Sequence, residues 1–193
     1  MKQVGLFFGS FNPIHIGHLI LANHFAEYTP MDEVWLVVTP QNPLKSKHSL
    51  LDNHQRLEMV YRATKDYPKL KPSDIEFHLP TPNYTIDTLV HLQEKYPEHR
   101  FALLLGEDNL RNFHKWKNYE VLLEHHPLYV YPRTGTTALP DAFKNHPNIH
   151  PINAPKIELS ASALRQAIKE GKNIRPLMPP DSWTYLDEMN FYQ

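Results

Sequence analysis

Short apolar runs alternate along the chain with segments in which apolar residues recur at helical spacing. Residues 4–8 form one such run, which ends at Gly9 and Ser10, and residues 34–38 form a second, rich in β-branched side chains. Runs of this length bounded by turn residues predict buried strands. The segment between them repeats apolar residues with a helical period at Leu19, Ile20, Ala22, Phe25 and Ala26. We therefore expect a strand, a helix and a second strand, joined by a right-handed crossover.

The same alternation continues to the other end of the chain. Further helices are predicted at residues 51–63, 85–94 and 161–170, the second capped by Thr85 and the third ended by Gly171. Further strands are predicted to end near Phe77 and to cover residues 101–105, 129–131 and, more weakly, 149–152. This pattern favours an α/β fold with a doubly wound parallel sheet. The length suits one domain over residues 1–193, with a helical carboxyl-terminal part at about 160–193.

Charge and composition narrow the classes of partner. Lys and Arg number 20 against 21 acidic residues, so the net charge of −1 gives no general attraction for nucleic acid or anionic membranes. Any phosphate site must therefore be local. The chain has no cysteine, which excludes disulfides, thiolate metal sites and a cysteine nucleophile, and is compatible with a reducing cytoplasm. No signal-peptide pattern and no membrane-length apolar run is visible, so a soluble cytoplasmic protein is expected.

The turn between the first predicted strand and helix carries the clearest chemical signal. Residues 9–18 read Gly-Ser-Phe-Asn-Pro-Ile-His-Ile-Gly-His. Backbone N–H groups at a helix start lack helical partners and the helix dipole is positive there, so this turn favours a phosphate. Gly9 and Gly17 permit close approach of the backbone to a ligand. His15 and His18, three residues apart, fall on neighbouring positions of one helix face and can both point at that anion.

Each of these features also has a simpler interpretation. A glycine after a strand is most often only a turn, and two histidines three apart are more often surface residues than ligands. A zinc site is the competing functional interpretation of His15 and His18. The usual helical metal pair is four residues apart with a glutamate between, and no third ligand is evident in the sequence. No protein-bound metal is therefore expected at these histidines.

A second segment with phosphate-binding chemistry begins the last predicted helix. Residues 159–165 read Leu-Ser-Ala-Ser-Ala-Leu-Arg. Ser160 or Ser162 can cap the helix, and the guanidinium of Arg165 one turn later suits a forked contact with phosphate oxygens. Taken alone, this segment would be better explained as an ordinary cap with a solvated arginine. Together with the histidine-bearing turn, it predicts a shared phosphate site.

These two segments resemble the nucleotidylyltransferase superfamily. Residues 9–13 followed by His-Ile-Gly-His look like its signature, whose His-x-Gly-His element contacts ATP phosphates. Residues 159–165 are similar to its Ile-Ser-Ser-Thr-x-x-Arg element, which grips the triphosphate. The resemblance implies a Rossmann-like nucleotidylyltransferase fold.

Three intermediate segments resemble one branch, the bacterial nicotinate mononucleotide adenylyltransferases. They are Tyr-Thr-Ile-Asp-Thr-Leu at 84–89, Gly-Glu-Asp at 106–108 with Trp-Lys at 116–117, and Pro-Leu-Lys at 43–45. The resemblance implies transfer of the adenylyl group of ATP, accompanied by Mg²⁺, to nicotinate mononucleotide. The products would be deamido-NAD and pyrophosphate, in NAD biosynthesis.

The resemblance also assigns roles to residues. ATP-binding residues would be Gly9, Ser10, Phe11, His15, Gly17, His18, Gly106, Asp108, Arg133, Ser160, Ser162 and Arg165. Residues for nicotinate mononucleotide would be Ser10, Phe11, Lys45, Tyr84, Thr85, Trp116 and Lys117. Catalytic residues would be His15, His18, Lys45 and Arg165. Trp116 would stack on the pyridine ring, the main chain near Thr85 and Lys117 would hold the carboxylate, and Asp108 would hold ribose hydroxyls.

The sequence departs from the branch at three places and leaves alternatives open. Phe8 occupies the usual first glycine of Gly-Gly-Thr-Phe, Leu44 replaces a histidine, and residues 132–135 differ from Arg-Pro-Gly. The acceptor could instead be nicotinamide mononucleotide or another phosphate such as phosphopantetheine, since one carboxylate-versus-amide contact decides between the two pyridine nucleotides. A cytidylyltransferase, a non-catalytic nucleotide-binding protein and a histidine-based metallohydrolase are further alternatives, and a homo-oligomer is compatible with the sequence.

Overall fold

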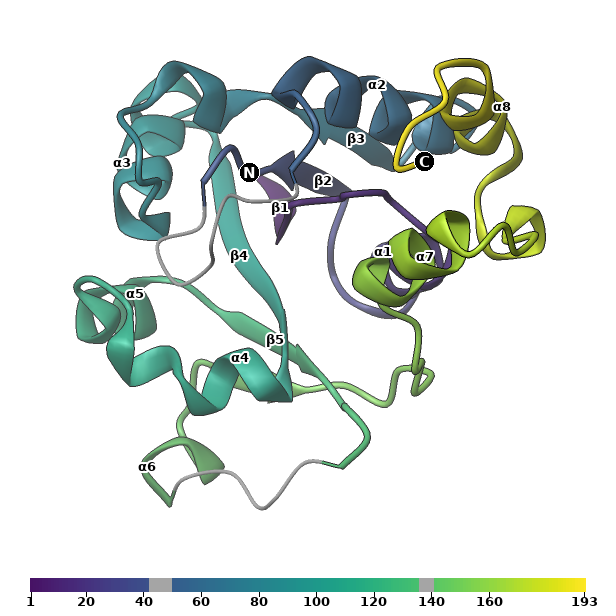
Figure 1. The fold of residues 1–193 in the computed structure, drawn as a ribbon. Helices are drawn as coiled ribbons and strands as arrows, with labels where there is room; N and C mark the ends of the chain where they lie inside the picture. Colours follow the sequence, from purple (N-terminus) through teal and green to yellow (C-terminus); the bar gives the residue numbers. More distant parts are fainter. Residues whose placement is uncertain (42–49, 136–140) are drawn as a thin grey trace.

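A single parallel sheet organises the chain. The computed structural model describes residues 1–41, 50–135 and 141–193. Within these ranges six parallel strands form one sheet in the order β3-β2-β1-β4-β5-β6 (Figure 1). The strands are β1 (Lys2–Gly9), β2 (Glu33–Val38), β3 (Leu70–Ser73), β4 (His99–Gly106), β5 (Leu128–Tyr131) and β6 (Ile149–Pro151). The prediction of a doubly wound parallel sheet is confirmed.

The strands are apolar on both faces because helices cover both sides of the sheet. In β4, Ala102 and Leu104 contribute to one core cluster, whereas Leu103 and Leu105 contribute to the other. This two-residue alternation follows from the pleat of a strand, and burial of both faces explains the unbroken apolar runs in the sequence. The clusters therefore lie on opposite faces of the same sheet.

The helices divide between these two clusters. The first cluster takes residues from α1 (Ile16–Tyr28), α2 (Asn53–Thr64), α7 (Ala161–Lys169) and α8 (Pro180–Glu188). The second takes residues from α3 (Thr85–Lys95), α4 (Glu107–Arg111), α5 (Tyr119–His125) and α6 (Asp141–Lys144). Short 3-10 turns are η1 (Ile75–His78), η2 (Phe113–Lys115) and η3 (Arg175–Leu177).

Three local expectations are corrected. The strand predicted to end near Phe77 ends at Ser73, because the chain turns there into η1, in which the Phe77 amide donates to the carbonyl of Asp74. Thr85 is the first residue of α3 and not its cap, which is Tyr84. In α1 the core-facing position belongs to Leu21, while Ile20 is 41% exposed.

The strand order places the functional segments. β1 pairs with β2 on one side and with β4 on the other, so the chain leaves β1 and β4 towards opposite edges of the sheet. In open parallel sheets this reversal opens a crevice at the carboxyl ends of the two central strands, where ligands bind. Here those ends are Gly9 and Gly106, so the predicted binding segments at residues 9–18 and 106–108 begin at the crevice.

Candidate active site

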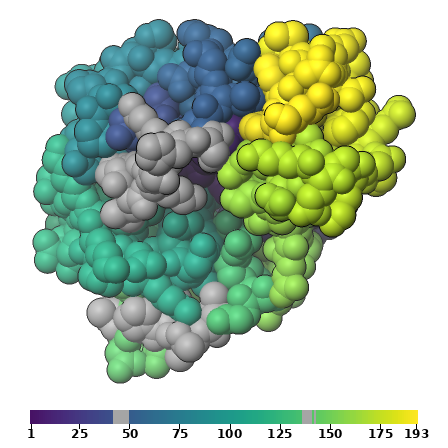
Figure 2. Space-filling model, in the orientation of Figure 1, coloured from purple at the N-terminus to yellow at the C-terminus, as the bar shows by residue number. Residues whose placement is uncertain are grey.

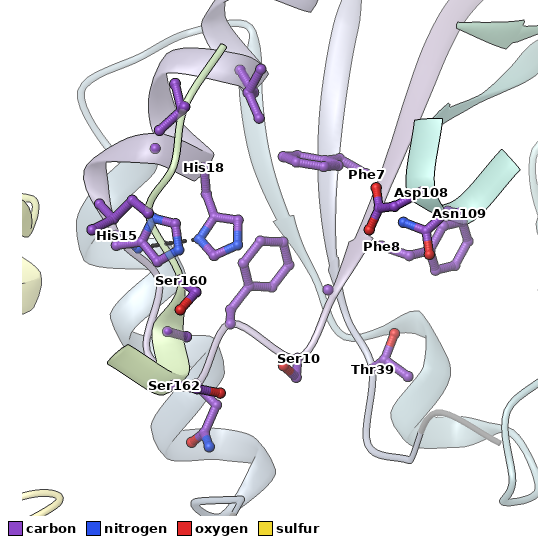
Figure 3. A pocket seen from close by; sticks show the side chains of 18 of the residues that line it. Phe7, Phe8, Ser10, His15, His18, Thr39, Asp108, Asn109, Ser160 and Ser162 are labelled. Carbon is purple, nitrogen blue, oxygen red and sulfur yellow. Dashed lines mark hydrogen bonds between the residues drawn. The ribbon is translucent and has the colours of Figure 1, made fainter. Parts of the chain in front are cut away.

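A cavity of about 500 Å³ lies at the carboxyl edge of the central strands. It is lined by residues that follow β1, β2, β4 and β5 and by the first turn of α7. Figure 3 shows its two sides: His15, His18 and Ser160 lie on one, Asp108 and Asn109 on the other. We call this the donor cavity. It is a crevice between segments that are distant in sequence.

The two histidines form a stacked pair at the start of α1. His15 is the cap residue of the helix and His18 lies in its first turn, and their ring centroids are 3.7 Å apart. The backbone N–H of His15 donates to Nδ1 of His18 over 3.3 Å (Figure 3). Because Nδ1 accepts this bond, a neutral His18 carries its proton on Nε2. The ring is thus oriented as a hydrogen-bond donor.

His15 is held in its neutral form. The side chain is buried, and this burial, together with the nearby charge of Arg133, lowers the pKa of His15 from 6.5 to about 4. Nδ1 of His15 is buried and has no hydrogen-bond partner among the described residues. At neutral pH the ring therefore offers a hydrogen bond and no full positive charge.

Arg165 joins the two segments that the sequence predicts to bind phosphate. Its Nη1 donates to the carbonyl oxygen of Asn12 over 2.7 Å, and its Nη2 donates to Oγ of Ser162 over 3.2 Å. The hydroxyl of Ser160 caps α7 by accepting from the amide of Ala163 over 3.2 Å. The starts of α1 and α7 consequently line one cavity, as the sequence predicts.

The two glycines of the turn line the donor cavity, and each also leaves space for a neighbouring side chain. A Cβ on Gly9 would lie 2.9 Å from the ring of Phe11, and one on Gly17 would lie 3.0 Å from Nδ1 of His15. The space that these residues leave is therefore occupied by side chains of the protein. Phe11 has a left-handed φ of 44° and its ring is buried beside His18, with centroids 5.1 Å apart. The ring of Phe11 thus packs against His18 within the lining of the donor cavity.

Asp108 and Arg133 form the opposite wall. Nε of Arg133 lies 3.7 Å from Oδ1 of Asp108, and the amide of Arg133 donates to the carboxylate of Glu107 over 3.2 Å. Gly106 precedes them as the cap of α4, and a Cβ there would meet Asp108 and the ring of Tyr131. The loop after β5 is thereby tied to the end of β4. Both predicted residues face the donor cavity.

A second cavity of about 280 Å³ adjoins the first. Its lining includes the predicted Tyr84, Thr85, Trp116 and Lys117. We call it the acceptor cavity. The two cavities share Phe8, Thr39 and Asn109 in their walls. Four of the residues predicted for nicotinate mononucleotide thus line this second space, whereas Ser10 and Phe11, predicted for both substrates, line the donor cavity.

The side chains of the acceptor cavity are held in place. Trp116 packs on Phe113 with ring centroids 5.1 Å apart. Nζ of Lys117 lies 2.9 Å from the carboxylate of Asp87 and 4.8 Å from the ring centre of Tyr84. The first turn of α3 and the segment after η2 are therefore linked across this cavity. Lys45, predicted as a catalytic residue and as a residue for nicotinate mononucleotide, lies outside the described residues.

Arg56 is a residue that sequence analysis missed. Its side chain is fully buried and donates to the carbonyl oxygens of Ser10 (2.6 Å), Thr39 (3.0 Å) and Leu51 (3.0 Å). It therefore holds together the loops that follow β1 and β2. A signal was present, because Arg56 shares the i, i+3, i+4, i+7 spacing of the buried face of α2 with Met59, Val60 and Ala63.

Glu76 is a second missed residue. It lines the acceptor cavity and is only 2% exposed. Its Oε1 accepts from the hydroxyl of Thr88 over 2.8 Å, whereas its Oε2 has no partner within the part of the chain that the structure describes. Burial raises the pKa of the Glu76 carboxyl. This carboxyl beside the acceptor cavity therefore keeps its proton to a higher pH than an exposed glutamate does.

Comparison with known proteins agrees with this geometry. Residues 6–167 match the family model described as cytidylyltransferase-like. A protein of Christiangramia forsetii is 61% identical over 192 residues, covering 100% of this chain and 99% of that protein. A protein of Flavobacterium johnsoniae is 59% identical over 191 residues, with 99% of each chain covered. Both are named probable nicotinate-nucleotide adenylyltransferase.

The chain belongs to the nicotinate-nucleotide adenylyltransferase family. The resemblance drawn from the sequence motifs is thus confirmed, and so is the prediction of a nucleotidyltransferase enzyme. The fold agrees as well. A structure of Plasmodium falciparum nicotinic acid mononucleotide adenylyltransferase complexed with NaAD matches with a TM-score of 0.84 at 23% identity, covering 100% of this chain and 98% of the other.

Two further findings concern metals and membranes. No cluster of three or more histidine, aspartate or glutamate side chains within residues 1–41, 50–135 and 141–193 is placed to hold a metal ion. Across the same ranges, every helix is too short or too polar to cross a membrane.

Replacing Arg56 by Met should destabilise this member of the nicotinate-nucleotide adenylyltransferase family by about 3 kcal/mol, because one buried and two partly buried carbonyl oxygens lose a charged donor. Urea unfolding followed by circular dichroism measures the loss. Arg62→Met on the same helix is the matched control, since the Arg62–Glu58 ion pair is partly exposed and such pairs contribute at most about 1 kcal/mol. Equal losses in the two variants would contradict the role assigned to Arg56.

Replacing Glu76 by Gln should change how stability depends on pH. The raised pKa of Glu76 means that its contribution to stability is fully present below its usual pKa of 4.5 and is lost as the pH rises through the folded value. The melting temperature of Glu76→Gln relative to the native chain should therefore increase from pH 4.5 to pH 8. Calorimetric scans test this, with the exposed Glu94→Gln as control; a flat difference for Glu76→Gln would refute it.

Proposed function

We propose that the chain transfers the adenylyl group of ATP to nicotinate mononucleotide, yielding deamido-NAD and pyrophosphate. The observation that carries this proposal is the pair of adjoining cavities with a common wall at Phe8, Thr39 and Asn109. The donor cavity has groups suited to binding a triphosphate, and the acceptor cavity has groups suited to binding an aromatic acid. A reaction that joins two nucleotides needs two such spaces in contact.

The donor cavity suits the phosphates of ATP. The amino termini of α1 and α7 both point their positive ends at it, and Arg165 and the Nε2–H of His18 add donors. Arg165 is already bound to Asn12 and Ser162, so its guanidinium is positioned before a ligand arrives. Asp108 on the opposite wall is placed to accept bonds from ribose hydroxyls. The phosphates and the nucleoside thus have separate sides of the cavity.

The acceptor cavity suits a pyridine nucleotide. The indole of Trp116 offers a face for stacking, and the first turn of α3 at Thr85 offers backbone donors to a carboxylate. Lys117 contributes positive charge on the same side. Burial raises the pKa of Glu76, so this carboxyl keeps its proton to a higher pH than an exposed one. The backbone donors of α3 and the charge of Lys117 favour the acid over the amide.

Catalysis of the chemical step depends more on positioning the two substrates than on proton transfer. An oxygen of the acceptor 5′-phosphate attacks the α-phosphorus of ATP, a new P–O bond forms, and the bond to the bridging oxygen breaks as pyrophosphate leaves. A phosphate monoester has its second pKa at about 6, so the attacking oxygen is already ionised at neutral pH and needs no general base. His18 and Arg165 would donate to the charge that grows on the leaving group, with His15 as a neutral donor. Lys45 is added to this set of catalytic residues because the family resemblance implies that role.

Magnesium is proposed to enter with ATP as part of the substrate. Its preferred ligands are oxygens, and Asp108 is the only carboxylate among the described residues that line the donor cavity. Phosphate oxygens and water would supply the remaining ligands, and the ion would offset negative charge on the triphosphate. A cytoplasmic location is proposed for the same enzyme.

The activity is tested by measuring pyrophosphate released from ATP and Mg²⁺ with nicotinate mononucleotide, nicotinamide mononucleotide or phosphopantetheine. We expect turnover to be fastest with nicotinate mononucleotide. His18→Ala should lower kcat by about two orders of magnitude, the size of effect seen when one preorganised transition-state donor is removed. An unchanged kcat for a folded His18→Ala would remove this residue from the mechanism.

Trp116→Ala should mainly weaken binding of the pyridine nucleotide, because the stacking surface is lost while the donor cavity is untouched. The KM for nicotinate mononucleotide should rise about tenfold, and Trp116→Phe should restore most of it. Steady-state kinetics with each substrate varied in turn separates the two cavities. A rise confined to the KM for ATP would show that Trp116 serves the donor side instead.

A further inference from the structure

The carboxyl-terminal residues return to the phosphate-binding turn. The hydroxyl of Tyr192 donates to Oδ1 of Asn12 over 2.6 Å, a contact between residues 180 positions apart. Burial raises the pKa of the Tyr192 phenol, so the hydroxyl keeps its proton and remains a donor. The last residues of the chain thus contact the loop that bears His15.

This contact is anchored on α2. The hydroxyl of Ser182 in α8 donates to the carbonyl of Met59 over 2.7 Å, and Phe191 is buried with its ring edge-on to Tyr185. Figure 2 shows the carboxyl-terminal segment in yellow packed beside the blue α2 segment and the yellow-green α7 segment. Tyr192 is therefore supported by the packed body of the protein when it reaches Asn12.

Asn12 connects this contact to the donor cavity. Its side chain is almost fully buried, and Oδ1 accepts a second bond from the amide of Leu51 over 3.2 Å. Its main-chain oxygen accepts from Nη1 of Arg165 over 2.7 Å. One residue therefore holds Tyr192 and Leu51 through its side chain and Arg165 through its backbone. Fixing the side chain restricts rotation of the residue whose carbonyl orients the guanidinium.

We propose that Tyr192 is a positioning residue for adenylyl transfer, whose hydroxyl fixes Asn12 so that Asn12 holds Arg165 towards the phosphates. The inference rests on the proposed function, because it assigns the arginine to the triphosphate. Without the hydroxyl, the side-chain oxygen of Asn12 loses the bond from Tyr192, while the bond from Leu51 remains. The Arg165 guanidinium would then be less restricted before reaction. Ordering it during the reaction would raise the free energy of the transition state.

The test compares Tyr192→Phe with Tyr185→Phe, which removes the same hydroxyl from a ring of the same carboxyl-terminal segment that packs on Phe191. We expect kcat with ATP and nicotinate mononucleotide to fall about tenfold in Tyr192→Phe, the effect of one lost hydrogen bond, and less than twofold in Tyr185→Phe. The KM for nicotinate mononucleotide should stay within twofold in both. Melting temperatures report the effect of each variant on folding.

Coupling to Arg165 distinguishes positioning from a brace for the fold. In an Arg165→Ala background, Tyr192→Phe should lower kcat less than twofold, because the group that Tyr192 positions is gone. A full tenfold loss in that background would overturn the proposal, and so would native kinetics of Tyr192→Phe with only a lower melting temperature. A native chain that releases no pyrophosphate would overturn the proposed function itself, whereas an active native chain with an unaffected Tyr192→Phe would overturn the positioning role alone.

Discussion

The bond from Arg165 to the carbonyl of Asn12 is the interaction on which the site depends. It spans 153 positions of the sequence and fixes the start of α7 against the loop after β1. Without it, two helix starts that each attract an anion would face the crevice independently. With it, one side of the donor cavity becomes a single rigid arrangement of amides, imidazoles and a guanidinium. Because the groups proposed to attract phosphate are concentrated at this place, the enzyme needs little net positive charge.

A buried cation provides the corresponding restraint for the other loops. Arg56 lies at the base of the site and donates hydrogen bonds to carbonyl oxygens of the loops after β1 and β2. A guanidinium can serve several carbonyls in fixed directions, which an apolar side chain of similar size cannot do. The position of the crevice therefore depends on a buried positive charge. Among the described residues that are predicted to bind substrate, Arg56 donates to Ser10 alone, at its carbonyl oxygen. Catalytic geometry and folding stability are linked at this residue.

Much of the fold and of the site could be predicted from the sequence because the relevant signals are local. The apolar runs gave the strands to within a few residues, and the motifs at His15 and Ser160 marked helix starts. Arg56, Glu76 and Tyr192 escaped because their roles come from contacts between distant segments, although Arg56 carried a helical-spacing signal. The strand expected near Phe77 failed for a different reason: apolar residues after Ser73 are buried in a turn, and burial alone does not distinguish a turn from a strand.

The wall that the two cavities share has a consequence for the rate of the reaction. Phe8, Thr39 and Asn109 border both spaces, so two molecules bound in them lie next to each other. Two mutually repelling anions in free solution would rarely come into line. Confinement in adjoining spaces turns their encounter into a first-order event, with an effective local concentration that dissolved substrates do not reach.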